Sequence, residues 1–320
     1  MSPYTTNISG KSLWDRQRPY VIAEVSGNHA KNRRRAEALV IAAGMAGADA
    51  VKFQTFTADE IAAKRVRIPR GVDTATDAWL DRLGVKTLRD LFTMGGLPRE
   101  WHKDLKECAT QAGLAFLSTP FSVDAAKFLV EEIGVPALKI ASGDLTFEPL
   151  LEYANTLNIP IILSTGGATL QEVHRAVDLL PHTYESGNLA LLHCVSVYPC
   201  PDEFANLNAI RTLGAQFLRC PIGFSDHTLS IETVPALAVA TGATILEKHI
   251  TLDDVGVDAG HSLDPRQFRR MVQQVRQVHA VLGTGKKEPC AAEMHDRLWA
   301  RRSPRDWKRP TDAARRGQWE

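Results

Sequence analysis

Two short segments in the last third of the chain place polar side chains where buried strands would end. Each begins with apolar residues and then sets two polar residues two positions apart, Ser225 with His227 and Glu247 with His249. Because side chains alternate between the faces of a strand, both members of a pair share one face. If the segments are neighbouring parallel strands, His227 and His249 open onto the same space, where two neutral imidazoles suit a divalent metal. A lone histidine is more often a hydrogen-bonded core residue, so this prediction depends on the repeated geometry.

Polar or charged residues also end most of the other apolar segments of the chain. They are Glu24, Lys52, Gln54, Thr119, Lys139, Ser142, Thr165 and His193, with Ser196 and Tyr198 just after the last of these segments. An inward-pointing charge at the end of a buried strand is costly unless it is paired or used. A structural salt-bridge network explains two or three such residues but not this many, so the pattern indicates a functional site.

The types of these residues favour a small anionic substrate. Lys52 and Lys139 suit a phosphate and a carboxylate. The remaining contacts would come from the side chains of Thr119, Ser142, Ser225 and Gln54. Glu24 and Glu247 are candidates for moving protons or holding ligands. We therefore expect a doubly anionic substrate beside a metal ion.

The segments that carry these residues alternate with helical patterns. Apolar runs predict strands over residues 21–25, 49–54, 113–120, 137–142, 159–167, 189–194, 223–228 and 243–249. Apolar residues at helical spacing predict helices over residues 31–46, 99–111, 121–133, 170–180, 206–213, 231–240 and 266–282. Eight parallel strands in such an alternation with helices close most economically as a (β/α)8 TIM barrel of the α/β class. An open doubly wound sheet is the alternative, but the chain has neither GxGxxG after its first strand nor a phosphate loop.

The predicted domain organisation is one barrel with extensions. Residues 1–20 are expected to form an N-terminal extension with a hairpin, and residues 21–290 the catalytic barrel. The insertion over residues 57–98 is too long for an ordinary loop after a strand. It is either a lid over the mouth of the barrel or an insertion with a structural role only. Residues 291–320 form a short basic tail.

Composition excludes several classes of protein. The formal net charge is +1, which argues against a general binder of nucleic acid or anionic membranes. The five cysteines are odd in number and show no CxxC pair, so neither a disulfide framework nor a zinc knuckle is expected. The first ten residues lack the pattern of a signal peptide, and no apolar run is long enough to span a membrane. We expect a soluble cytoplasmic protein.

The chain resembles the sialic acid synthase family, the phosphoenolpyruvate-dependent synthases of N-acetylneuraminate and other nonulosonic acids. The resemblance runs from about residue 20 to 290 and is carried by motifs in the family's order. These are Ile22-Ala23-Glu24, residues 47–55, Ser118-Thr119-Pro120-Phe121, residues 138–143, Ser164-Thr165-Gly166-Gly167, residues 193–196 with Tyr198-Pro199, Ser225-Asp226-His227-Thr228 and Glu247-Lys248-His249.

The resemblance implies a TIM barrel that condenses phosphoenolpyruvate with the open-chain aldehyde of an N-acetylated hexosamine and releases phosphate. His227 and His249 would bind Mn²⁺ or Mg²⁺, which polarises the aldehyde oxygen. Glu24 and Glu247 would activate or orient the attacking water. The phosphoenolpyruvate site would comprise Lys52, Gln54, Thr119, Lys139, Ser142 and Ser225, and the sugar would meet Asp144, Ser196, Tyr198 and Asp258. The family is dimeric, so we expect a homodimer.

Three departures from the family pattern concern the sugar site. Asp144 stands where many members have glutamate, and Ser196 where some have asparagine. After Ser303 only about 20 residues remain, too few for the family's C-terminal antifreeze-like domain, which supplies an arginine to the partner's acceptor site. We therefore expect a chain without that domain, and an acceptor sugar that can differ from N-acetylmannosamine.

Two other functions stay open at this point. Lys52 or Lys139 could act as the Schiff-base nucleophile of a metal-independent aldolase. The barrel could also bind ligand without catalysis.

Overall fold

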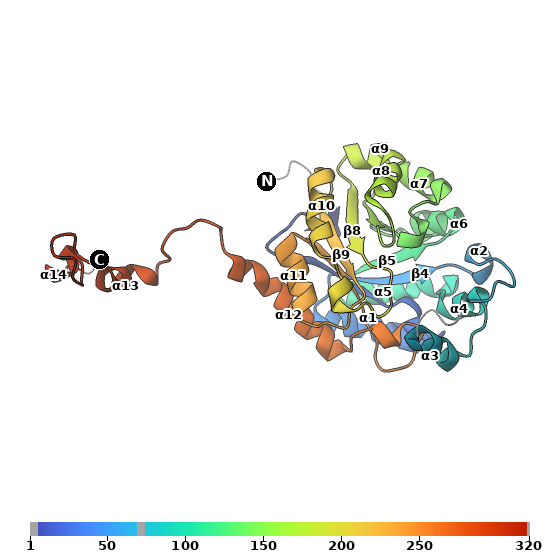
Figure 1. Ribbon diagram of the computed structural model, residues 1–320. Helices are drawn as coiled ribbons and strands as arrows, with labels where there is room; N and C mark the ends of the chain where they lie inside the picture. The colour runs from blue at the N-terminus through green and yellow to red at the C-terminus, as the bar shows by residue number, and fades with distance from the viewer. Residues whose placement is uncertain (1–5, 69–73, 319–320) are drawn as a thin grey trace. The chain divides into compact units, whose positions relative to one another are not determined.

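The computed structural model is a barrel of eight parallel strands surrounded by helices (Figure 1). It describes residues 6–68 and 74–318, apart from the side chains of residues 74–77 and 79. The strands are β3 (Tyr20–Glu24), β4 (Ala50–Thr55), β5 (Ala115–Pro120), β6 (Leu138–Ile140), β7 (Ile161–Ser164), β8 (Leu189–Cys194), β9 (Ile222–Asp226) and β10 (Ile245–His249). They pair in the order β5-β4-β3-β10-β9-β8-β7-β6, and β6 lies beside β5, which closes the ring. The predicted TIM barrel is confirmed, and the doubly wound alternative is wrong.

Alternation along each strand separates two apolar cores. One core fills the inside of the ring with the side chains of Tyr20, Ile22, Ala50, Ala115, Leu117, Ala137, Ile162, Ala190, Leu192 and Ile245, joined by Ile8 and Leu13. The larger core lies between the strands and the helices and includes Val21, Val51, Phe53, Phe116 and Phe224. Residues two positions further along each strand than these inner residues therefore also face inward, at the carboxyl ends of the strands.

The helices between strands lie close to the predicted ranges. They are α1 (Arg33–Ala46), α5 (His102–Gln111), α6 (Val123–Lys127), η3 (Phe128–Ile133), α7 (Glu148–Asn155), α8 (Leu170–Asp178), α9 (Pro181–Glu185), α10 (Asn208–Gln216), α11 (Thr233–Thr241) and α12 (Pro265–Leu282). Three features differ from the sequence prediction. The expected helix over 121–133 changes to π-helical geometry at Phe128, and the short helices α7 and α9 were not predicted.

The insertion after β4 is mostly helical. It contains α2 (Ala58–Ile61), α3 (Thr74–Leu83) and α4 (Leu88–Gly95), followed by the turn η2 (Arg99–Trp101); its residues 69–73 lie outside the described part. The insertion is held to the barrel through Phe56, whose ring meets those of Phe92 and Phe121 edge-on. His29 adds a hydrogen bond of 3.0 Å from its ring to the carbonyl oxygen of Gly95. These contacts place the insertion at the carboxyl ends of the strands, where the polar residues lie.

A charged cluster closes the opposite end of the barrel. The hairpin of β1 (Asn7–Ile8) and β2 (Lys11–Ser12) precedes the first barrel strand. Lys11 and Arg18 donate to the buried carboxylate of Asp49 at 2.8 and 2.7 Å. The backbone N–H of Val21 also donates to this carboxylate, at 3.0 Å. These partners lower the pKa of Asp49 even though burial acts to raise it.

The chain divides into two compact units, residues 1–280 and residues 281–320. The second unit contains α13 (Glu293–Ala300) and α14 (Asp312–Arg315). Within it, Ser303 is fully buried and donates to Asp312 at 2.5 Å, and Arg315 pairs with Asp306 at 2.8 Å. No helix in the described residues is both long enough and apolar enough to span a bilayer.

Candidate active site

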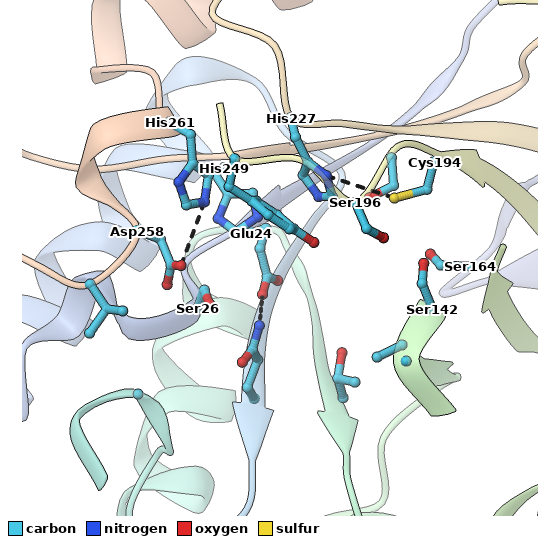
Figure 2. A pocket seen from close by; sticks show the side chains of 18 of the residues that line it. Glu24, Ser26, Ser142, Ser164, Cys194, Ser196, His227, His249, Asp258 and His261 are labelled. Atoms are coloured by element: carbon cyan, nitrogen blue, oxygen red, sulfur yellow. Dashed lines mark hydrogen bonds and ion pairs between the residues drawn. The ribbon is translucent and has the colours of Figure 1, made fainter. Parts of the chain in front are cut away.

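A cavity of about 920 Å³ opens at the carboxyl ends of the barrel strands. Figure 2 shows its interior, with three histidines on one side and Ser142, Ser164 and Cys194 on the other. The structure brings together 13 of the 14 residues that the sequence assigned to a site, namely Glu24, Lys52, Gln54, Thr119, Lys139, Ser142, Ser196, Tyr198, Ser225, His227, Glu247, His249 and Asp258. The exception is Asp144, which follows the lining residue Gly143 but does not line the cavity itself.

Two residues that the sequence placed in the polar ring face away from the cavity. His193 stacks on Phe224 and its Nε2 bonds the carbonyl oxygen of Ala205 at 2.9 Å. Thr165 donates to the carbonyl oxygen of Leu192. The prediction was wrong for both. Leu192 and Ile162 face inward, and because side chains alternate along a strand, the residues two positions later, Cys194 and Ser164, face the cavity instead.

Two lysines and two glutamates form the charged floor of the cavity. Lys52 Nζ lies 2.6 Å from Glu24 Oε2 and 3.7 Å from Glu247 Oε1, while Lys139 Nζ lies 3.8 Å from the same Glu247 oxygen. All four side chains are at least 94% buried. Hydroxyl groups surround them: Lys52 donates to Thr119 at 3.0 Å and Lys139 to Ser164 at 2.6 Å. Burying four charges together requires such close pairing, and it leaves two cations available to an anion that enters the cavity.

The two glutamates titrate differently because their surroundings differ. Burial raises the pKa of Glu24 to about 7, with the Glu247 carboxylate adding to the rise and Lys52 opposing it. Burial also acts to raise the pKa of Glu247, but Lys139 and Lys52 outweigh it and lower that pKa below its ordinary value. The Glu247 carboxyl group is therefore ionised at neutral pH, whereas the Glu24 carboxyl group titrates near neutral pH. Separated pKa values of this kind suit one group to proton transfer and the other to charge stabilisation.

His227 and His249 lie on the wall above this floor. His249 ends β10 and His227 directly follows β9, the adjacent parallel strand, as predicted, and their ring centroids are 5.6 Å apart. His227 donates from Nδ1 to the carbonyl oxygen of Val195 at 2.8 Å, which leaves the lone pair on Nε2. Burial lowers the pKa of His227 to about 4 and that of His249 well below its ordinary value. Both rings are therefore neutral at pH 7, the form that binds a metal ion.

A third histidine, His261, joins this wall and was missed from the sequence. It ends the turn η6 (Ala259–His261), three residues after Asp258, and its ring centroid is 4.6 Å from that of His249. Tyr198 lies against the same group, with its ring 4.1 Å from His227 and 5.0 Å from His261. The spacing Asp258-x-x-His261 in a loop after a barrel strand was the available signal, because residues three apart in a single turn point the same way.

The cavity is also lined by residues of the insertion and by Phe56, which precedes it. Phe56, Leu91 and Phe92 supply apolar surface, and Arg82 of α3 supplies a cationic side chain. The cavity thus combines a charged floor, a histidine wall and a partly apolar entrance, which is the arrangement expected for a small polar substrate that must be shielded from water.

Comparisons with known proteins identify the family. A model of the NeuB family matches residues 39–287. The chain is 40% identical over 290 residues to the N,N′-diacetyllegionaminic acid synthase of Legionella pneumophila, a match that covers 89% of this chain and 79% of the relative. It is 32% identical to the N-acetylneuraminate-9-phosphate synthase of Mus musculus, covering 87% of this chain and 76% of the relative.

A solved structure shares the fold. The N-acetylneuraminic acid (sialic acid) synthetase of Leptospira borgpetersenii superposes with a TM-score of 0.77 at 32% sequence identity. The match covers 92% of this chain and 96% of that chain. These findings confirm the resemblance seen in the sequence motifs, and the chain belongs to the NeuB family.

Proposed function

We propose that this protein condenses phosphoenolpyruvate with the open-chain aldehyde of a sugar, giving a 2-keto-3-deoxy sugar acid of the nonulosonic type and inorganic phosphate. The carbon–carbon bond forms between C3 of phosphoenolpyruvate and the aldehyde carbon. Water then adds at C2, and the C2–O bond to phosphate breaks as the new C2 hydroxyl becomes the ketone. One proton of the water ends on the former aldehyde oxygen and the other on the departing phosphate, so the reaction needs no further reactant.

The buried lysine pair is the observation that carries this proposal. Lys52 and Lys139 are each 3% exposed and both lie within 4 Å of Glu247, so the cavity floor holds two fixed cations out of contact with bulk water. A phosphoenol ester carries a carboxylate and a phosphate on three carbons, which suits two cations with hydroxyl donors around them. Thr119, Ser142 and Ser225 line the same floor, and Gln54 lies beside Glu24.

The carboxylates provide the proton handling that the reaction requires. Glu24, whose pKa is about 7, is suited to accept a proton from the water that attacks C2. Glu247 keeps its charge, and its Oε2 is buried without a hydrogen-bond partner among the described residues. A buried carboxylate oxygen without a hydrogen bond is costly, so this oxygen favours a bound water or a substrate hydroxyl that donates to it.

The histidine wall fits a divalent cation. The Nδ1 atom of His249 is buried and has no hydrogen-bond partner among the described residues, and His227 presents a free ring nitrogen. We propose that His227 and His249 hold Mn²⁺ or Mg²⁺, which acts as a Lewis acid on the aldehyde oxygen. Tyr198, Ser196 and Asp258 border this side of the cavity and are proposed to contact the acceptor sugar. Asp144 is proposed only to support the loop that presents Ser142 and Gly143.

Phosphate release tests the proposal. The protein is mixed with phosphoenolpyruvate and Mn²⁺ and a panel of N-acetylated hexosamines, pentoses and phosphosugars, and phosphate is measured against a sample treated with a chelator. We expect release with at least one aldose and its loss on chelation. If no aldose causes phosphate release and phosphoenolpyruvate raises the thermal stability of the protein, the result would instead support a non-catalytic binding protein.

The Schiff-base alternative has its own test. Borohydride treatment in the presence of a carbonyl substrate would inactivate the protein irreversibly if Lys52 or Lys139 formed an imine. We expect no such inactivation, because both lysines are paired with Glu247. A homodimer remains a prediction from the family resemblance, and a cytoplasmic location remains a prediction from the cysteine content and the N-terminal sequence.

A further inference from the structure

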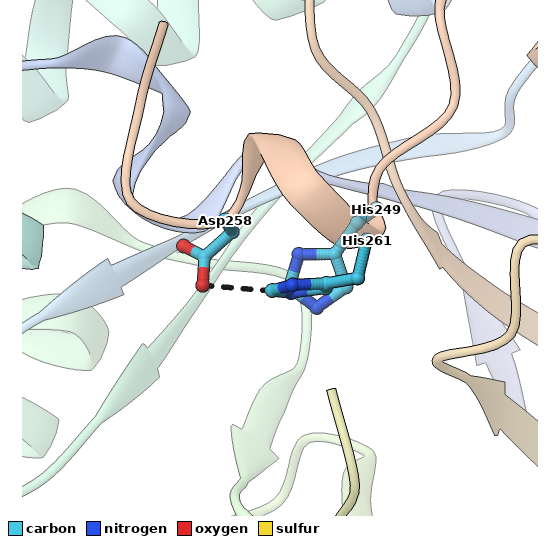
Figure 3. A group of neighbouring side chains, drawn as sticks. All are labelled: His249, Asp258 and His261. Atoms are coloured by element: carbon cyan, nitrogen blue, oxygen red, sulfur yellow. Dashed lines mark ion pairs between the residues drawn. The ribbon is translucent and has the colours of Figure 1, made fainter. Parts of the chain in front are cut away.

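We infer that His261 and Asp258 complete the metal site, so that the cation is held by a cluster of imidazoles and one carboxylate that favours a transition metal over Mg²⁺. This inference rests on the proposed function, in which His227 and His249 hold a divalent ion. Figure 3 shows His249, Asp258 and His261 directed toward one another. One ligand atom from each of these three residues lies within 4.8 Å of the other two.

One ring nitrogen of each histidine in this cluster has no hydrogen-bond partner in the described part of the chain. His249 Nδ1 and His261 Nε2 are both buried, and neither has a hydrogen-bond partner among the described residues. His261 Nε2 lies 3.5 Å from Asp258 Oδ1, which is too long for a good hydrogen bond. Buried ring nitrogens are normally satisfied in folded proteins, so two unsatisfied ones in a group that also holds a carboxylate favour a metal ion as their shared partner.

Asp258 is oriented for this role by the backbone. The N–H of Gly27 donates to Asp258 Oδ2 at 2.8 Å, which leaves Oδ1 for the cluster. Ser262 donates to the carbonyl oxygen of Asp258 at 2.6 Å and accepts from Asn28 Nδ2 at 2.8 Å. Hydrogen bonds of this kind to the second oxygen and to the flanking backbone fix the direction of a carboxylate ligand.

Close packing holds the whole loop in place. Gly256 has a φ of +125°, and a Cβ at this position would lie 2.6 Å from the Cα of Asn28. A Cβ on Gly27 would lie 2.9 Å from Val257. The loop that carries Asp258 and His261 is therefore docked tightly on the segment after β3, as a preorganised metal site requires.

The ligand chemistry determines the class of metal. Mg²⁺ binds oxygen ligands and retains several waters, whereas imidazole suits Fe²⁺, Ni²⁺, Cu²⁺ and Zn²⁺, and affinity for a mixed nitrogen and oxygen site rises from Mn²⁺ through Fe²⁺ and Co²⁺ to Cu²⁺. Two imidazoles with one carboxylate, and His227 beside them at a ring distance of 6.4 Å from His261, form a nitrogen-rich set. The structure thus assigns the site to a first-row transition metal.

Binding of Co²⁺ to the full chain, without substrates, tests the inference. The visible ligand-field spectrum of Co²⁺ reports the number and type of its ligands, and competition with a chromophoric chelator gives the affinity. We expect the wild-type protein to bind one Co²⁺ that millimolar Mg²⁺ does not displace. His261→Ala should weaken binding on the order of a hundredfold and change the spectrum, and added imidazole should restore the spectrum. His174→Ala, a half-buried histidine on α8 outside the cavity, is the matched control and should leave both unchanged.

The outcomes separate this inference from the proposed function. If His261→Ala binds Co²⁺ with the wild-type affinity and spectrum while the wild type releases phosphate from phosphoenolpyruvate, the role of His261 is refuted and the proposed function stands. Displacement of Co²⁺ by millimolar Mg²⁺ would refute the preference for a transition metal. A wild type that binds no Co²⁺ would overturn both the inference and the proposed metal site.

Discussion

Replacing Glu24 with glutamine should remove a titration near neutral pH. Glu24 is 1% exposed, and burial raises its pKa from an ordinary 4.5 to about 7. The native state therefore holds this proton more tightly than the unfolded chain does. Between these two pKa values the native protein binds more protons, so the contribution of Glu24 to stability is present at low pH and is lost as the pH rises through 7.

The size of the effect follows from the rise in pKa. Each pKa unit corresponds to about 1.4 kcal/mol, so a rise from 4.5 to about 7 corresponds to about 3 kcal/mol. Glutamine keeps the shape of the side chain but does not titrate. The free energy of unfolding of the wild type, minus that of Glu24→Gln, should fall by about 3 kcal/mol from below pH 4.5 to above pH 7, with most of the fall between pH 5 and 8.

Two assays measure this titration in the ligand-free protein. Urea denaturation of both proteins at a series of pH values gives the stability difference, and ¹³C NMR of labelled glutamate gives the titration directly. A carboxyl resonance with a midpoint near 7 should be present in the wild type and absent from Glu24→Gln. Glu152→Gln, an exposed position on α7, should show neither change. A stability difference that does not vary with pH, or a midpoint near 4.5, would refute the assignment.

Three further predictions follow from other parts of the structure. Lys139→Met removes a buried cation and leaves Glu247 with one fewer partner, so phosphoenolpyruvate affinity, measured by calorimetry, should fall by at least tenfold; an unchanged affinity would contradict the proposed donor site. Asp49→Asn leaves Lys11 and Arg18 facing a neutral group at the end of the barrel opposite the cavity. The free energy of unfolding should therefore fall by about 3 kcal/mol while the affinity for Co²⁺ stays constant. A fall of less than about 1 kcal/mol would show that this cluster does not stabilise the fold. Gly256→Ala forces the loop away from Asn28, so the affinity for Co²⁺ should fall at least tenfold. Gly143→Ala, where a Cβ meets open space, should have little effect on this affinity. Equal Co²⁺ affinities of the two variants would show that the loop does not position the metal ligands.

The sequence was sufficient for the barrel and for most of the cavity, because both depend on short-range periodicity. Apolar runs alternating with helical patterns specify parallel strands joined by crossover helices, and eight of them specify closure. The inward direction of Lys52 and Lys139 then follows from alternation along β4 and β6. Helix α7 was overlooked because it is short and begins with Pro149 in its first turn, so its apolar pattern is brief.

The errors arose where a strand end was located one residue from its true position. Thr165 and His193 were read as inward because each follows an apolar run, but the strands β7 and β8 turn the neighbouring Ser164 and Cys194 inward. A shift of one residue reverses the face of every side chain, so short strands leave little sequence to fix the register. His261 was missed for a different reason, since its approach to His249 depends on how a loop packs on the segment after β3, which periodicity does not specify.

The central claim is that one cavity holds phosphoenolpyruvate on the lysine floor and a divalent metal on the histidine wall. A crystal structure of the protein soaked with Mn²⁺ and phosphoenolpyruvate, with anomalous data to locate the metal, tests it directly. We predict a manganese peak bonded to ring nitrogens of His227 and His249, and phosphoenolpyruvate in contact with Lys52 and Lys139. A manganese peak elsewhere, or phosphoenolpyruvate bound outside this cavity, would contradict the account.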